Sequence, residues 1–195
     1  MSILLLAGSP SIPSRSTRLL QYAAERLQTA GHRTRMLHVL DLPAQALLHA
    51  DFNNGDIKVA KAHVDEADAI VIATPVYKAA YSGVLKAFLD LLRQDGFAGK
   101  LVLPLATGGS QSHMLALDYA LRPVLSALGA RHVLPSVYAT DAQVQWSDKG
   151  IALDPGIEQR IHDGVQNLSA LLHAAHAHGS ASFASVPFSA VRCSV

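Results

Sequence analysis

ILLLAGSPSIPSRSTRLL, residues 3–20, is the stretch that decides the fold of this chain. Its beginning, Ile3–Ala7, is an uninterrupted apolar run, which predicts a strand covered on both faces. Apolar residues then recur at helical spacing from Leu19, which predicts a helix over Ser16–Thr29. The loop over residues 8–17 therefore joins the end of a strand to the start of a helix.

This loop is rich in hydroxyl groups, and its position favours an anion. Backbone N–H groups at a helix start are unpaired and electropositive. Ser14, Ser16 and Thr17 add hydroxyl donors, and Arg15 adds a charge-assisted bond. The loop lacks both G-x-x-x-x-G-K-[ST] and G-x-G-x-x-G, so its pattern favours a lone phosphate monoester such as that of a flavin mononucleotide. The alternative is a capped helix start without a ligand, because Ser and Thr are common there.

Strand-like and helical segments alternate along the rest of the chain, which predicts an α/β protein with a doubly wound, open parallel sheet. In that class, ligands bind at the carboxyl ends of strands, so the loops after strands one, three and four form the candidate site. The predicted strands are Ile3–Ala7, Thr34–Val39, Ala69–Ala73, Leu101–Ala106 and His132–Ala139. The predicted helices are Ser16–Thr29, Asp56–Ala67, Gly83–Arg93, His113–Leu128 and a last one from Asp154 to about Ala175.

Length and composition limit the possible classes. At 195 residues, a single domain over 1–175 is expected, followed by a tail over 176–195 that is either disordered or an interface arm. The net charge of +1 excludes electrostatic recruitment of nucleic acid or acidic membranes. A hydrophobic content of 50% suggests a buried subunit interface. The lone Cys193 and the absence of a membrane-length apolar run favour a cytoplasmic protein.

The two later loops suit a flat heterocycle. The third strand leads into Pro75-Val76-Tyr77-Lys78, which offers main-chain donors and bulk beside a ring. The fourth leads into Thr107-Gly108-Gly109-Ser110, where the glycines let backbone approach a ligand. By itself, Gly108-Gly109 favours a plain strand-to-helix turn, and Tyr77 could be an ordinary half-buried aromatic. The coincidence of three suitable loops at one sheet edge favours a binding site.

Motifs in these loops carry a family resemblance. The chain reads Gly8-Ser9 and then Ser14-Arg15-Ser16 after strand one, and a P-x-Y element followed by Ser82-Gly83-Val84-Leu85-Lys86 and Asp90 after strand three. It thereby resembles the NADPH-dependent FMN reductase family. It is most similar to the reductases of two-component alkanesulfonate monooxygenase systems, through ATPVYKAAYSG (73–83), LPLATGG (103–109) and DYALRPVLSAL (118–128).

The resemblance implies a flavodoxin-like sheet of order 2-1-3-4-5 and a hydride transfer from NADPH to FMN, with no catalytic side chain. It implies a monooxygenase partner that receives the reduced flavin, a homodimer or homotetramer, and a helix irregularity at a subunit interface around Tyr119. The implied FMN contacts are Ser9, Ser14, Arg15, Ser16 and Thr17 for the phosphate, and Pro75, Val76, Tyr77, Lys78, Thr107, Gly108, Gly109 and Ser110 for the ring. Ser11 stands where the family often has Arg, so Arg15 is expected to supply the phosphate's charge partner.

Two other function classes stay open at this point. A related enzyme on the same scaffold would keep its flavin and reduce quinones, azo dyes or metal oxyanions. A non-enzymatic flavin carrier is disfavoured, because such carriers are strongly acidic and this chain carries +1. No metal is expected: His173, His176 and His178 lack carboxylate or cysteine support and suit a polar helix end.

Overall fold

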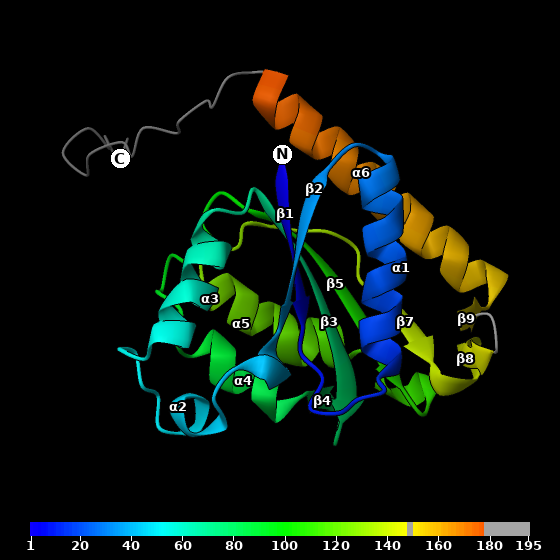
Figure 1. The fold of residues 1–195 in the computed structure, drawn as a ribbon. Helices are drawn as coiled ribbons and strands as arrows, with labels where there is room; N and C mark the ends of the chain where they lie inside the picture. Colours follow the sequence, from blue (N-terminus) through cyan, green and yellow to red (C-terminus); the bar gives the residue numbers. More distant parts are fainter. Residues whose placement is uncertain (148–149, 178–195) are drawn as a thin grey trace, which may run out of the picture.

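The computed structural model describes residues 1–147 and 150–177, and its centre is a parallel sheet (Figure 1). The sheet contains β1 (Ser2–Ala7), β2 (Arg33–His38), β3 (Ala69–Tyr77), β5 (Leu101–Gly108), β6 (His132–Val133) and β7 (Val137–Thr140). The strand order is β2-β1-β3-β5-β6, and β7 also pairs with β5. The predicted flavodoxin-like order is therefore confirmed, with β6 and β7 together forming the fifth strand.

The fifth strand differs from the prediction of one continuous strand over His132–Ala139. β6 pairs with the start of β5 and β7 with its end; between them, the Leu134 amide still donates to the Val102 carbonyl, and residues 135–136 leave the ladder. Pro135 has no backbone N–H to donate, so an unbroken strand is disfavoured at this point. The sheet therefore has an interrupted outer edge.

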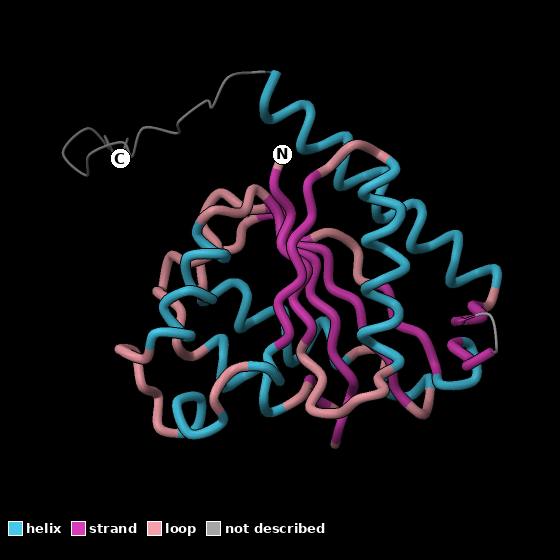
Figure 2. The backbone as a smooth tube through the Cα atoms, in the orientation of Figure 1, coloured by secondary structure: helices cyan, strands magenta, loops and turns pink. Residues whose placement is uncertain are grey.

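Helices cover both faces of the sheet, as Figure 2 shows. α1 (Arg15–Thr29) and α6 (Pro155–Ala177) pack on one face, while α3 (Gly55–Asp65), α4 (Gly83–Leu89) and α5 (Arg122–Ala127) pack on the other. Alternate residues of β1 serve the two cores: Leu4 and Leu6 pack with α3 and α4, while Ile3 and Leu5 pack with α1 and α6. Because both faces are buried, β1 is apolar at every position after Ser2.

Other elements depart from the sequence prediction. The helix from Gly83 ends at Leu89 rather than Arg93. The predicted helix His113–Leu128 is divided into η2 (Gln111–His113), a π-helix η3 (Leu117–Leu121) and α5. Pro123 lacks the N–H for an ordinary helical bond one turn back, which favours the wider π turn before it. Elements without a sequence prediction are η1 (Val39–Asp41), α2 (Ala44–Leu48), β4 (Ala80–Tyr81), η4 (Asp141–Gln143), and a hairpin of β8 (Val144–Ser147) and β9 (Gly150–Leu153).

The proposed tail begins within α6, because that helix continues to Ala177. The rest of the tail, including His178 and Cys193, lies outside the described residues. Among the described helices, none combines the length and the apolar character needed to cross a bilayer.

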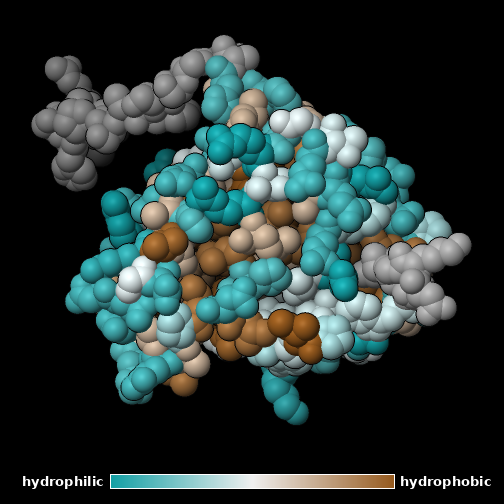
Figure 3. Space-filling model, viewed as in Figure 1, coloured by the Kyte–Doolittle hydropathy of each residue, from teal (hydrophilic) through white to brown (hydrophobic). Residues whose placement is uncertain are grey.

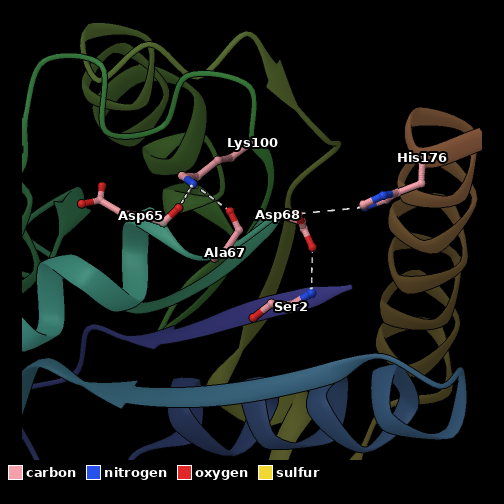
Figure 4. Close-up of polar contacts among 6 residues, drawn as sticks. All are labelled: Ser2, Asp65, Ala67, Asp68, Lys100 and His176. Carbon is pink, nitrogen blue, oxygen red and sulfur yellow. Dashed lines mark hydrogen bonds and ion pairs between the residues drawn. The ribbon is translucent and has the colours of Figure 1, made fainter. Parts of the chain in front are cut away.

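Polar contacts join the amino ends of the strands, at the edge opposite the candidate site (Figure 4). The Asp68 carboxylate accepts a hydrogen bond from the Ser2 amide at 2.8 Å, and its other oxygen lies 3.9 Å from His176 Nε2. The Lys100 ammonium donates to the carbonyls of Asp65 and Ala67 at 2.9 and 2.7 Å. Burial lowers the pKa of Lys100. These contacts connect β1, the entry to β3, and the end of α6, so we assign this edge a structural role.

A buried histidine predicts that stability depends on pH. His32 is 6% exposed; its Nε2 lies 2.8 Å from Ser169 Oγ in α6, and its ring lies 5.6 Å from that of His173. Burial, then the nearby His173 and the chain's amino terminus, lower the pKa of His32 from its usual 6.5. Below that value the unfolded chain binds more protons at this position than the folded one, so stability falls as pH drops. We expect the urea midpoint to fall between pH 7.5 and pH 5.5, and to fall less in His32→Gln; equal falls in the two proteins would contradict the assignment.

Candidate functional site

Three loops meet at the carboxyl edge of the sheet, and hydrogen bonds to Ser82 connect the first two of them. The Ser82 hydroxyl donates to the Gly8 carbonyl in the loop after β1, and accepts from the Leu85 amide at the start of α4. The Ser82 amide donates to Thr74 Oγ1 near the end of β3 at 3.0 Å. Ser82 and Thr74 are both fully buried. The first two predicted loops are thus held in a fixed relation.

The first loop ends in a capped helix start. Ser14 caps α1: its Oγ accepts from the Thr17 amide at 3.3 Å and lies 3.0 Å from Ser16 Oγ. The amides of Arg15 and Ser16 belong to the first helical turn, so no carbonyl within the helix accepts from them. The Ser9 hydroxyl is used locally, donating to the Ser11 carbonyl at 3.2 Å. Unpaired amides beside a hydroxyl pair can bind an oxyanion, while Ser9 and Ser16 are themselves buried.

Arg15 points toward a segment that the sequence did not associate with it. Its Nε donates to the Val144 carbonyl at 3.1 Å, and its Nη1 lies 3.8 Å from Asp141 Oδ2. Arg18 lies over the Trp146 ring, 5.6 Å from its centroid. The segment after β7 therefore flanks the first loop. No local pattern could have indicated this, because 129 positions separate Arg15 from Val144.

The second loop is a tight hairpin at the tip of β3. Tyr77 pairs with Ala80 of β4, so Lys78 and Ala79 alone make the turn, with φ of +49° and +63°. Such a turn favours Asn-Gly, since positive φ costs other residues about 1–2 kcal/mol each. Pro75 is half-buried, Val76 is buried, and Tyr77 and Lys78 are exposed. The hairpin extends beyond the neighbouring strands in Figure 1, as an edge wall of the site.

The third loop uses its two glycines differently. A Cβ at Gly108 would collide with the Tyr138 hydroxyl, whereas a Cβ at Gly109 would meet nothing within 4 Å. That hydroxyl donates to the Ser110 carbonyl at 2.6 Å, and burial raises the pKa of Tyr138. Thr107 is buried, and Gly109 and Ser110 are exposed. Tyr138 therefore requires Gly108, and Gly109 is the glycine that leaves open space.

Exposed apolar side chains surround this edge. Ile12 in the first loop is 81% exposed. Figure 3 shows hydrophobic side chains gathered in the lower part of the molecule, where the first loop runs in Figure 1. Tyr119, in the π-helix, is 78% exposed, with Met114 and Leu115 about half exposed nearby in the chain. The predicted helix irregularity around Tyr119 is confirmed. No group of three or more His, Cys, Asp or Glu within 1–147 and 150–177 is placed to hold a metal ion.

Comparison with known proteins identifies the family. A sequence model of NADPH-dependent FMN reductases matches residues 1–145. An FMN reductase (NADPH) of Pseudomonas putida is 44% identical over 174 residues, 88% of each chain. An FMN reductase (NADPH) of Escherichia coli is 43% identical over 89% of this chain and 91% of its own. A crystal structure of the NADH:FMN oxidoreductase EMOB, 40% identical, superposes with a TM-score of 0.80 over 87% of this chain and 89% of that one. The chain therefore belongs to the NADPH-dependent FMN reductase family, whose enzymes use NADPH to reduce FMN.

Proposed function

We propose that the three loops form the FMN site of this reductase, and that the reduced flavin serves an alkanesulfonate monooxygenase. The observation that carries the site proposal is the start of α1, where unpaired amides and the Ser14 hydroxyl face the same edge as the open backbone at Gly109. The support for the monooxygenase partner is the similarity of residues 73–83, 103–109 and 118–128 to reductases of two-component sulfonate systems.

The protein's contribution to the reaction is orientation. Bound FMN supplies the chemistry, because its ring accepts the hydride of the nicotinamide. The amides of Arg15 and Ser16 and the Ser14 hydroxyl bind the phosphate. Backbone from Pro75 to Lys78 would line one side of the ring, and Gly109 would leave space for the nicotinamide. No side chain has to move a proton for hydride transfer, so the site needs the two rings held in contact at about 3–3.5 Å.

Steady-state kinetics with free flavin test the function. NADPH oxidation by the purified enzyme is expected to saturate with added FMN, and gel filtration is expected to strip most of the flavin. Purification as a yellow protein that reduces quinones or azo dyes faster than free FMN would favour the flavin-retaining alternative. Adding an alkanesulfonate, oxygen and a flavin-dependent alkanesulfonate monooxygenase tests the partner, with sulfite release expected. Absence of sulfite, where chemically reduced FMN produces it, would exclude transfer to that partner.

We propose that the Arg15 guanidinium, besides its contacts with Val144 and Asp141, also binds the phosphate, and Arg15→Gln tests this. A charge-assisted bond contributes about 1.5–3 kcal/mol, so we expect the KM for FMN to rise roughly tenfold or more. The KM for riboflavin, which lacks the phosphate, should change little. Arg18→Gln is the matched control, because Arg18 is on the same helix but lies over Trp146. An equal rise for FMN and riboflavin in Arg15→Gln would show that Arg15 acts by holding Asp141 and Val144 rather than by binding phosphate.

We also propose that Tyr119 lies at an interface between copies of this chain. Its 78% exposure, beside the half-exposed Leu115, places exposed apolar surface next to the site. Tyr119→Ser is expected to shift the sedimentation coefficient toward a smaller species. The exposed Tyr77→Ser serves as a control for the loss of a surface aromatic. An unchanged sedimentation coefficient in Tyr119→Ser would remove this assignment.

A further inference from the structure

A cavity of about 450 Å³ opens at the interrupted outer edge of the sheet, and the FMN site proposed above does not use it. Residues from three parts of the chain line it: η2 to the start of α5, the break between β6 and β7, and the second turn of α6. The lining residues that give the cavity its charge and its apolar surface are Met114, Asp118, Arg122, Val133, Pro135 and Arg160. Its volume lies within the roughly 300–1,000 Å³ of small-molecule sites.

Two guanidinium groups give the cavity its chemistry. Arg160 donates to the carbonyls of Ser136 at 3.0 Å and Tyr138 at 3.3 Å, which positions its guanidinium at the cavity wall. Arg122 pairs through Nε with Asp118 at 3.1 Å, four positions earlier in the chain. A guanidinium has five N–H donors, so each arginine keeps donors beyond these bonds. With one carboxylate against two guanidiniums, the cavity carries net positive charge.

The cavity also has an apolar part and a connection to the reaction site. Met114, Val133 and Pro135 provide aliphatic surface suited to a flat base. Tyr138, which lines the cavity, donates its hydroxyl to the Ser110 carbonyl in the third loop. Gln111, also in the lining, directly follows Ser110. The cavity therefore borders the loop where Gly109 leaves space for the nicotinamide.

We propose that this cavity binds the 2′-phosphoadenosine end of NADPH, with Arg122 and Arg160 on the 2′-phosphate. A phosphate monoester dianion matches two guanidiniums through charge-assisted bonds, and aliphatic walls cover the adenine. The placement rests on the proposed function, because it puts the nicotinamide at the third loop. It assigns discrimination between NADPH and NADH to these arginines, since NADH lacks the 2′-phosphate.

Kinetics of Arg122→Gln and Arg160→Gln test the assignment. We expect the KM for NADPH to rise about tenfold or more in each variant, with the KM values for NADH and FMN nearly unchanged. Arg93→Gln is the matched control, because Arg93 is also an exposed arginine paired with an aspartate, Asp95. Equal rises for NADPH and NADH, or no rise in either variant, would overturn the proposal. If Arg160→Gln fails to fold, Arg122→Gln still decides, because the Arg122 ion pair is local to its own helical segment.

A binding measurement separates this proposal from the FMN site. Calorimetry of the flavin-free enzyme is expected to show adenosine 2′,5′-bisphosphate binding at least tenfold tighter than adenosine 5′-monophosphate. Arg122→Gln should remove that difference. Equal affinity for the two nucleotides would overturn the proposal even where Arg15→Gln behaves as expected. Conversely, the flavin-free enzyme could prefer the bisphosphate while Arg15→Gln shows normal FMN kinetics. That pair of results would count against the FMN site and leave the NADPH cavity standing.

Discussion

Gly108→Ala is expected to destabilise the enzyme by about 2–3 kcal/mol and to abolish most FMN reduction, while Gly109→Ala leaves stability nearly unchanged. A methyl group at Gly108 would occupy the place of the Tyr138 hydroxyl. Tyr138 is almost completely buried, and its hydroxyl is held in place by the Ser110 carbonyl, so the ring moves aside only at a cost. Displacing it would break the bond to the Ser110 carbonyl and shift the third loop. Urea unfolding of the two variants measures the difference in stability.

A second substitution tests the cause. Tyr138→Phe removes the hydroxyl, and the ring carbon that carried it would then lie 3.3 Å from the new Cβ at Gly108, a tight but tolerable approach. Gly108→Ala combined with Tyr138→Phe should therefore be more stable than Gly108→Ala alone. The alternative outcome is that the loss of stability in the double variant equals the sum of the losses in Gly108→Ala and Tyr138→Phe. That result would show that Tyr138 is not the group that excludes a side chain at Gly108.

The neighbouring glycines show what the sequence could predict and what it could not. The sequence predicted that the three candidate loops lie at one edge of the sheet. This prediction came from the alternation of apolar runs and helical patterns, because parallel strands place their carboxyl ends at one edge. The difference between Gly108 and Gly109 did not, because it depends on Tyr138, 30 positions later in the chain. Local patterns report periodicity and capping, whereas a side chain that fills the space over a glycine is a tertiary contact.

Arg15 illustrates the same limit at the first loop. The capped helix start was evident from the hydroxyl residues before Leu19, and Ser14 does cap α1. The Arg15 guanidinium, however, contacts Val144 and Asp141, which belong to elements that periodicity did not predict. η4 and β8 are only three and four residues long, too short to give a reliable pattern. A helix irregularity around Tyr119 was expected only from family resemblance; the structure shows it to be a π-helix, whose i→i+5 bonding leaves no clear sequence period.

Ser82→Ala is expected to cost about 3 kcal/mol of stability and to raise the KM for FMN several-fold, because one hydroxyl serves two buried groups. Without it, the Gly8 carbonyl loses its donor and the Leu85 amide loses the cap of α4. Asn54→Ala is the matched control: Asn54 caps α3 by accepting from the Asp56 and Ile57 amides, and its backbone hydrogen bonds to Asp51 and Lys58 are also local. It should cost only about 1 kcal/mol and leave the KM for FMN unchanged.

The contrast between the two variants isolates the contact between loops from the helix cap. Both lose a cap, but only Ser82→Ala leaves a buried carbonyl in the first loop without a partner, so the excess cost belongs to the bond that joins Gly8 to the third strand's loop. A free first loop would no longer hold the amides of Arg15 and Ser16 at a fixed distance from the ring-binding backbone, so FMN would lose affinity through its phosphate. Riboflavin reduction should therefore suffer less than FMN reduction in Ser82→Ala. Equal costs in the two cap variants, with FMN kinetics unchanged, would mean that the loops hold their positions without Ser82.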